Sequence, residues 1–344
     1  MTFRSLVGHR RITTLLSRAI ARDTLPPTLL FAGPAGVGKW QAAMAAAQAL
    51  NCVNPVQPTG LESRDGESLA IDACGECRSC ERIARGLHVD VIALAPDDKA
   101  SIKIDVVRDV LARTTYRPFE GRRRVVLIRE AETLEPQAQN ALLKSLEEPP
   151  PATVFIMTTS VPGTLLPTVR SRSMTVRFGR LPAADVALAL VRDFERAEPE
   201  AAALAALADG SIGQALALEN ADVSVLRETA LELLQQAAGR GDAQRRLQVA
   251  GAIVGPPKKE RAREDMAIVF RLTASMLRDI EAINSGVDAR LIANPIVADD
   301  LRALARHFGG DRGRDAFAAV DRALSALERN VGAKVVAEWL SLQL

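Results

Sequence analysis

Apolar and polar positions follow two different patterns along the chain. Up to about residue 180, short apolar runs alternate with segments in which apolar residues recur every three or four positions. The apolar runs predict buried strands of a parallel sheet, and the segments between them predict helices that cover both of its faces. We expect strands at "TLLFA" (28–32), "VDVIAL" (89–94), "RVVLI" (124–128), "TVFIMT" (153–158) and "MTVRF" (174–178), and helices near 39–50, 103–115 and 136–147.

After "RLPAAD" (180–185) the strand pattern ends. The rest of the chain is rich in Ala and Leu with a period near 3.6, and Gly and Pro interrupt it at 208–214, 254–257 and 307–310. The predicted fold class is therefore α/β followed by all-α. We divide the chain into an α/β domain (1–180), a small helical domain (181–220) and a larger helical bundle (221–344).

Composition adds few constraints on function. Of the 344 residues 48% are hydrophobic and 3% aromatic, and 44 basic residues against 42 acidic ones give a net charge of +2. This balance neither requires nor excludes nucleic acid as a partner, so any contact with DNA would depend on a local patch. The N-terminus has no apolar core of signal-peptide length, and the chain has no run of about 18 apolar residues. We therefore expect a cytoplasmic protein without a membrane partner.

All four cysteines lie between positions 52 and 80, which favours a metal site over disulfides in a cytosolic chain. Residues 53–73 contain Pro, Gly, Ser and acidic residues without a period, so we interpret about 52–85 as an insertion. The predicted ligands are a C-x₂-C-x₂-C triplet and one remote cysteine: Cys74, Cys77, Cys80 and Cys52. Four thiolates suit tetrahedral Zn²⁺, but the same triplet occurs in iron–sulfur proteins, where the fourth ligand is also remote. The spacing of the cysteines does not decide between zinc and an iron–sulfur cluster.

The stretch "GPAGVGKW" (33–40) fits the phosphate-binding loop pattern G-x-x-x-x-G-K-[ST] except at its last position. It follows a predicted strand and opens a predicted helix, which is the context that such a loop requires. In these loops, backbone N–H groups and the helix N-terminus surround phosphate oxygens, glycines allow close approach, and the lysine neutralises charge. The candidate nucleotide-binding residues are Gly33, Gly36, Gly38 and Lys39.

Two magnesium-binding positions of such a site are altered. Magnesium is normally held by the Ser or Thr that ends the loop pattern and by an acidic residue at the end of a second strand. Here Trp40 offers no oxygen, and "VVLI" (125–128) is followed by Arg129, which places a positive charge where the cation would bind. Glu130 follows, where a catalytic base could stand. We expect that this loop does not support ATP hydrolysis.

Further stretches occur in order along residues 1–220: "LVGHRRITTLLSRAI" (6–20), "NALLKSLEEPP" (140–150), "TTSVPGTLLPTVRSRS" (158–173) and "GSIGQAL" (210–216). Together with the phosphate loop and the cysteine cluster, they resemble the bacterial clamp-loader AAA+ subunits of DNA polymerase III. The resemblance implies an AAA+ P-loop domain over 1–180 with structural zinc in its insertion, a lid domain over 181–220, and a collar for ring assembly over 221–344.

The resemblance also implies roles for individual residues. Lys39 is the phosphate lysine and Thr159 a sensor of the γ-phosphate. Arg172 falls on the arginine of the family's Ser-Arg-Cys motif, which acts as an arginine finger in a neighbouring subunit's site. Ser173 replaces the Cys of that motif, which has no catalytic task. Gln214 stands where the family often has an Arg that contacts the phosphates.

The departures at Trp40, Arg129 and Gln214 all concern nucleotide chemistry, whereas Arg172 is retained. The resemblance therefore implies a non-hydrolysing subunit, with the question open whether ATP or ADP still binds. Its implied partners are the gamma/tau and delta subunits, the sliding clamp, and primer–template DNA through the assembled complex. We expect the chain to complete the ring, to present Arg172 to an adjacent ATP site and to help load the clamp.

Two alternative functions share these motifs. An active ATPase of the gamma/tau kind would need a hydroxyl at position 40 and an acid at position 129, and this chain has neither. A zinc-dependent DNA-binding module built on "CGECRSC" (74–80) is disfavoured, because its flanks hold as many acidic as basic residues and no stacking aromatics.

Overall fold

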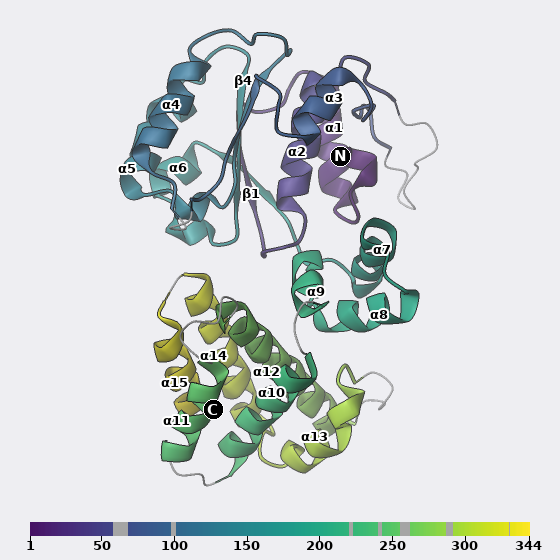
Figure 1. The fold of residues 1–344 in the computed structure, drawn as a ribbon, viewed down its shortest axis with the longest axis vertical. Coiled ribbons are helices and arrows are strands. Elements are labelled where there is room, and N and C mark those ends of the chain that lie inside the picture. The colour runs from purple at the N-terminus through teal and green to yellow at the C-terminus, as the bar shows by residue number, and fades with distance from the viewer. Residues whose placement is uncertain are drawn as a thin grey trace. The chain divides into compact units, whose positions relative to one another are not determined.

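The computed structural model describes residues 1–57, 68–97, 101–219, 223–239, 243–254, 262–286, 292–329 and 331–344. Over these ranges the chain forms two compact units (Figure 1). The first comprises Met1–Arg196 with Gly210–Gly213, and the second comprises Ala197–Asp209 with Gln214–Leu344. Of the expected loops, residues 58–67 of the insertion and 255–257 of the later interruption lie outside the described ranges. The predicted domain boundaries at 180 and 220 stay predictions.

A parallel sheet forms the centre of the first unit. Within the ranges given above it has five strands, in the order β2-β3-β4-β1-β5, and every neighbouring pair is parallel. The strands are β1 (Thr28–Ala32), β2 (Val91–Leu94), β3 (Arg124–Ile128), β4 (Thr153–Thr159) and β5 (Met174–Arg177). The predicted parallel α/β architecture is confirmed.

Helices cover both faces of this sheet. They are α1 (Arg10–Ala21), α2 (Lys39–Asn51), α3 (Arg78–Ala84), α4 (Ile104–Thr114), α5 (Pro136–Glu147) and α6 (Pro167–Ser171), with short 3₁₀ turns η1 (Phe3–Ser5), η2 (Ala131–Thr133) and η3 (Pro162–Thr164). Helix α7 (Ala183–Phe194) follows the last strand. The side chains of β1 show the two faces. Leu29 and Phe31 join the core beneath α1, α2 and α3, whereas Leu30 joins the core beneath α4, α5 and α6 (Figure 1). A strand buried on both sides carries a continuous apolar run, as β1 does from Leu29 to Ala32.

Strand β2 begins two residues later than predicted, because the preceding residues form a turn. The Val91 N–H donates to the His88 carbonyl at 3.1 Å. Asp90, whose side chain is fully buried, accepts hydrogen bonds from the backbone N–H groups of three residues in the loop before β3 (Phe119, Glu120 and Gly121) and from the Arg124 guanidinium at 2.8 Å. A buried carboxylate thus fixes the loop that leads into β3.

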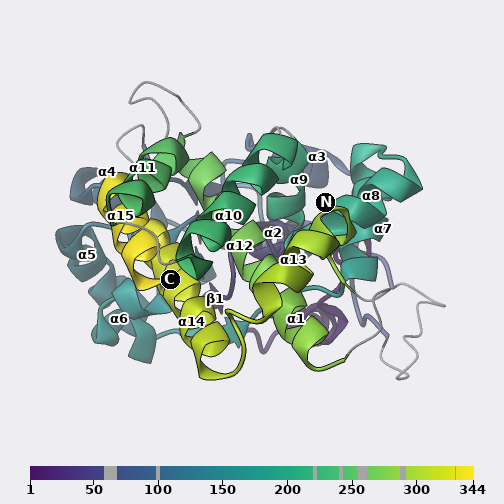
Figure 2. The ribbon, with the colours of Figure 1, turned by 90° about the horizontal axis from the view of Figure 1, so that it is seen from below.

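The second unit is helical. Its elements are α8 (Glu198–Leu207), most of α9 (Ile212–Glu219), α10 (Val223–Ala238), α11 (Ala243–Val254), α12 (Ala262–Asn284), η5 (Pro295–Val297), α13 (Ala298–Ala305), α14 (Asp311–Glu328) and α15 (Ala333–Gln343). Helix α12 packs against α10, α13 and α14, while α11 packs against α15 (Figure 2). The predicted all-α second part is confirmed.

In the described part of the chain, no single helix is long and apolar enough to cross a membrane. One bent pair of helices, Glu198–Leu207 with Ile212–Leu218, meets the length and composition requirements and nothing more.

Candidate functional site

The phosphate-loop pattern lies at the carboxyl edge of the sheet, between β1 and α2. The loop is held beside the end of β4, because Ala32 pairs with Thr159 and the Gly33 N–H donates to the Thr159 carbonyl at 3.2 Å. Gly38 precedes the first turn of α2 with φ of 99°, a left-handed conformation that favours glycine. The strand–loop–helix context predicted from the sequence is therefore present.

Residues far along the chain pack directly on this loop. The Ser211 hydroxyl donates to the Ala35 carbonyl at 2.9 Å, and the Gly213 N–H donates to the Gly36 carbonyl at 3.1 Å. A Cβ at Gly36 would lie 2.4 Å from the Ser211 Oγ and 2.9 Å from the Gly213 Cα, so only glycine fits there. Sequence reasoning singled out Gln214 in this segment but missed that its neighbours contact the loop.

The lysine of the loop contacts the loop's own backbone. Lys39 is 8% exposed, and its Nζ donates to the carbonyls of Gly33 and Pro34, both at 2.6 Å. These contacts place the ammonium inside the curve of the loop, where it can neutralise a phosphate group. Thr159 is buried, and its Oγ1 accepts a hydrogen bond from the Val161 N–H at 3.2 Å. The predicted sensor hydroxyl thus lies beside the loop and also caps the turn after β4.

The two residues that stand at the predicted magnesium positions contact each other. The guanidinium carbon of Arg129 lies 6.0 Å from the centroid of the Trp40 ring, within range of a cation–π interaction. Arg129 also pairs with Glu130, with 3.2 Å between Nε and Oε1. An indole that supplies no oxygen and a guanidinium that repels cations do not fit a magnesium ion. The loop glycines and Lys39 retain the chemistry for phosphate alone.

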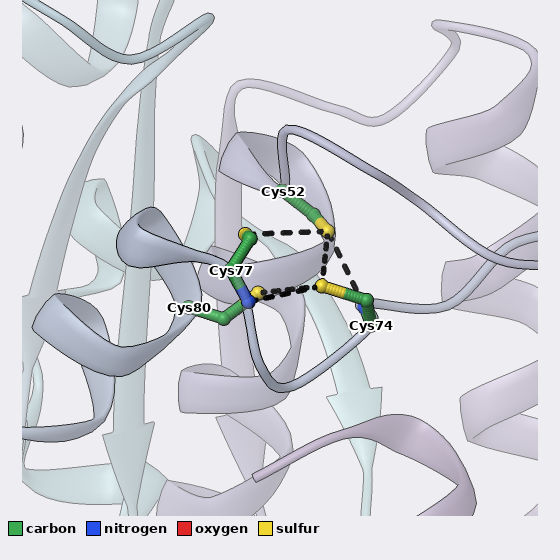
Figure 3. A group of neighbouring side chains, drawn as sticks. All are labelled: Cys52, Cys74, Cys77 and Cys80. Atoms are coloured by element: carbon green, nitrogen blue, oxygen red, sulfur yellow. Dashed lines mark hydrogen bonds between the residues drawn. The ribbon is translucent and has the colours of Figure 1, made fainter.

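The four cysteines converge at the far end of α2 (Figure 3). Cys52 follows that helix directly, Cys77 precedes α3, Cys80 lies within α3, and Cys74 lies on the connecting loop. All four sulfur atoms lie within 4.8 Å of one another. The Sγ of Cys52 is 3.5 Å from that of Cys74 and 3.9 Å from that of Cys77, and the Sγ atoms of Cys74 and Cys80 are 4.0 Å apart. A single metal ion could be bound by all four side chains.

Burial and hydrogen bonds tune these thiols differently. Burial raises the pKa of the Cys52 and Cys80 thiols. Burial acts in the same direction at Cys77, but hydrogen bonds from the backbone N–H groups of Cys80 and Val53 outweigh it and lower the pKa of that thiol to about 6. The lowered pKa favours the thiolate of Cys77, the form in which cysteine binds metal.

The N-terminal segment is tied to the cysteine cluster. The fully buried Asp72 accepts hydrogen bonds from the N–H groups of Phe3 at 2.9 Å and Arg4 at 3.0 Å. The Arg4 guanidinium donates to the Cys74 carbonyl at 2.8 Å. These contacts join two segments about 70 residues apart around the candidate metal site.

Arg172 lies at the opposite edge of the sheet from the phosphate loop. It follows α6 and precedes β5, whose first residue Met174 is level with Leu29 on β1, whereas the loop begins after Ala32. Three residues of strand separate these levels, roughly 10 Å along β1. The Arg172 Nε donates to Glu147 Oε1 at 2.6 Å, and its Nη2 donates to the same oxygen. The structure therefore does not bring Arg172 to the chain's own phosphate loop.

Comparison with known proteins identifies the family to which this chain belongs. Residues 8–182, just over half of the chain, match the family described as DNA polymerase III, delta subunit. The chain belongs to this family. The resemblance to clamp-loader subunits is thereby confirmed at the level of the family.

Several curated relatives are polymerase III subunits. The chain is 40% identical over 144 residues to the delta' subunit of Pseudomonas aeruginosa, covering 42% of this chain and 40% of that protein. It is 32% identical over 231 residues to the tau/gamma subunit of Haemophilus influenzae, covering 65% of this chain and 31% of that protein. It is 32% identical over 256 residues to the tau subunit of Escherichia coli, covering 74% of this chain and 36% of that protein. The matched regions thus span well under half of each relative.

Two solved structures that match the chain have low sequence identity and TM-scores below 0.5. A gamma subunit-related protein of Thermotoga maritima is 15% identical with a TM-score of 0.41, covering 96% of this chain and 97% of that one. The RuvB branch migration motor of the same organism is 16% identical with a TM-score of 0.40, covering 85% and 88%.

For this member of the delta family, the sequence-predicted residues fall into three groups in space. Gly33, Gly36, Gly38, Lys39 and Thr159 gather at the loop, the four cysteines gather beyond α2, and Arg172 stands apart from both. Sequence reasoning missed Glu147 as the partner of Arg172, although the quoted stretch "NALLKSLEEPP" contains it. No periodicity or spacing in the sequence links the two residues, since 25 positions separate them.

Proposed function

We propose that this chain is a delta-prime-type subunit of the DNA polymerase III clamp loader, one that does not hydrolyse ATP at its own loop. The contact between Trp40 and Arg129 carries this proposal, because both positions that would hold magnesium are occupied by groups unable to bind it. Relatives of the delta' and the tau/gamma kinds both match the chain, so the family alone does not separate the two functions. A gamma/tau-like active ATPase is the alternative.

In this proposal Arg172 acts in trans. Its guanidinium lies at the amino edge of the sheet, roughly 10 Å along the strand direction from the chain's own phosphate loop, and would serve the ATP site of an adjoining subunit instead. There it would donate hydrogen bonds to phosphate oxygens on which negative charge increases during phosphoryl transfer. The phosphate loop of this chain needs no magnesium for this role. Loss of the metal positions together with retention of Arg172 is therefore consistent within one protein.

The proposal includes the partners and the organisation of the chain. The partners would be the gamma/tau and delta subunits, the sliding clamp, and primer–template DNA through the assembled complex. Residues 1–180 would form the AAA+ domain, 181–220 the lid and 221–344 the collar that joins the ring. Such a subunit would work in the cytoplasm. Gly33, Gly36, Gly38, Lys39 and Thr159 would at most hold ATP or ADP without turning it over.

Structural zinc is the metal that we propose for Cys52, Cys74, Cys77 and Cys80. A tetrahedral ion with Zn–S bonds of about 2.3 Å separates its sulfur ligands by about 3.8 Å. The sulfur distances of 3.5, 3.9 and 4.0 Å agree with one such ion. An iron–sulfur cluster would distribute the same thiolates around several iron atoms and hold them farther apart. Zinc here would fasten the insertion to α2 and the N-terminal segment.

ATP turnover by the purified chain tests the assignment. We expect no hydrolysis above background with magnesium, with or without DNA, and the same background for Lys39→Ala. Hydrolysis by the wild-type chain that Lys39→Ala abolishes would favour the gamma/tau-like alternative.

A further inference from the structure

The guanidinium of Arg172 is held on one edge by a single carboxylate. Its Nε and Nη2 both donate to Glu147 Oε1, so the Nε–Nη2 edge faces the last residue of α5. The Nη1 atom lies on the other side of the fork, where it donates to the Thr168 carbonyl at 3.1 Å and lies 3.5 Å from the Ser171 Oγ. These contacts are longer than the 2.6 Å contact with Glu147.

The pairing fixes the direction of a long side chain at the surface. The Arg172 side chain is 33% exposed and that of Glu147 is 48% exposed, so solvent reaches both partners. An exposed ion pair of this kind contributes little to folding, but it restricts the rotamers of an arginine that would otherwise sample many. An arginine has five N–H donors, and the carboxylate engages one edge of the fork. The carboxylate therefore holds the Nε–Nη2 edge, while Nη1 has only the longer contacts with Thr168 and Ser171.

We propose that Glu147 is a positioning residue for Arg172, which it orients for the phosphate of a neighbouring subunit. This inference rests on the proposed finger role of Arg172. Glu147 is the last residue of α5, and Arg172 directly follows α6. These two helices pack against each other, so both partners of the ion pair are held by contacting elements. Glu147 makes no contact with phosphate in this arrangement. It acts by holding the Nε–Nη2 edge of the guanidinium, so that Nη1, whose own contacts are longer, can turn to the partner's ATP.

The test uses the reconstituted clamp loader and measures DNA- and clamp-stimulated ATP hydrolysis. Glu147→Ala should lower the turnover of the adjoining site by roughly five- to tenfold at unchanged KM for ATP, because a misdirected arginine slows the chemical step and does not weaken ATP binding. Glu147→Gln should lower kcat less, since its amide oxygen still accepts a hydrogen bond. Glu148→Ala is the matched control: this neighbouring glutamate is also exposed, and its variant should stay within about twofold of wild type.

A double variant separates positioning from a general structural role. If Glu147 acts through Arg172, then Arg172→Ala with Glu147→Ala should be no slower than Arg172→Ala alone. Additive losses, or a Glu147→Ala loader as fast as the Glu148→Ala loader, would overturn the inference. Thermal unfolding checks that each variant is folded. If Glu147→Ala does not fold, Glu147→Gln takes its place in the test. Full activity of Arg172→Ala itself would refute the finger role, which is a different outcome from failure of the positioning role alone.

Discussion

The guanidinium of Arg129 lies over the indole of Trp40, 6.0 Å from the ring centroid, at the end of β3 and the start of α2. The two positions that bind magnesium in hydrolysing phosphate loops are thus joined to each other by a cation–π contact. Each substitution removes a metal ligand, and together they place a cation against an apolar ring. In our proposal this pair, more than the loop pattern, marks the site as one that does not hydrolyse ATP.

Replacing both residues of this pair by magnesium-binding ones should make nucleotide binding depend on magnesium. Trp40→Thr with Arg129→Asp supplies a hydroxyl and a carboxylate, so the double variant should bind a fluorescent ATP analogue at least about tenfold more tightly with magnesium than with EDTA. The measurement is a titration under both conditions, and Lys39→Ala in the double variant is the control that should remove binding. The wild-type protein should show no gain on addition of magnesium. A wild-type affinity that rises with magnesium would mean that the ion fits the site after all.

The cysteine cluster should contain about one zinc per chain and no iron, since its sulfur spacing matches a single tetrahedral ion. Cys77→Ser should lose the metal and lower the thermal unfolding midpoint, because three thiolates leave the coordination shell incomplete. Elemental analysis of the purified protein measures the content directly. Glu76→Ala, an exposed residue inside the same triplet, should retain zinc and serves as the control. A brown protein with visible absorbance would contradict the assignment.

The buried pair of Asp90 and Arg124 should make stability depend on acid pH. Burial alone would raise the pKa of the Asp90 carboxyl, but N–H groups of Gly121, Glu120 and Phe119 and the Arg124 guanidinium together lower it to about 2. The folded pKa lies below the ordinary value of 3.8, so the contribution is complete above about pH 4 and is lost as pH falls toward 2. It amounts to about 2 kcal/mol.

Asp90→Asn isolates this contribution. The variant should be less stable at neutral pH by roughly 3 to 5 kcal/mol, because Arg124 is left as an uncompensated buried charge. Between pH 4 and 2 the wild-type protein should lose more unfolding free energy than the variant, as measured by denaturant titrations at each pH. Equal losses in both proteins over this range would show that Asp90 has an ordinary pKa.

Much of the fold could be predicted from the sequence, because β1, β3 and β4 are buried along their whole length and each carries a continuous run of at least four apolar residues. The cysteine cluster could be predicted too, since three of its ligands are close in sequence and the spacing itself carries the information. The contact of Ser211 with the phosphate loop and the pairing of Glu147 with Arg172 could not. Both depend on how separate elements meet in space, and polar residues at such meeting points leave no periodic signal.

The central claim concerns Arg172, whose position at the amino edge of the sheet keeps it from its own phosphate loop. In the adjoining site a finger of this kind contributes about 10³ to 10⁵ in rate where it is the main stabiliser of the transition state. Arg172→Lys should retain little of the stimulated ATP hydrolysis, because an ammonium lacks the planar fork of a guanidinium. Arg170→Ala removes an exposed arginine from α6, the helix that Arg172 directly follows, and is the matched control, expected to behave as wild type.

The most direct measurement is DNA- and clamp-stimulated ATP hydrolysis, together with clamp loading, by a reconstituted loader that carries Arg172→Ala. We predict that this loader assembles normally, loses hydrolysis in the site adjoining this subunit and loads clamps slowly, while the Arg170→Ala loader keeps full activity. Full stimulated hydrolysis and normal clamp loading by the Arg172→Ala loader would contradict the account and leave this chain a purely structural member of the ring.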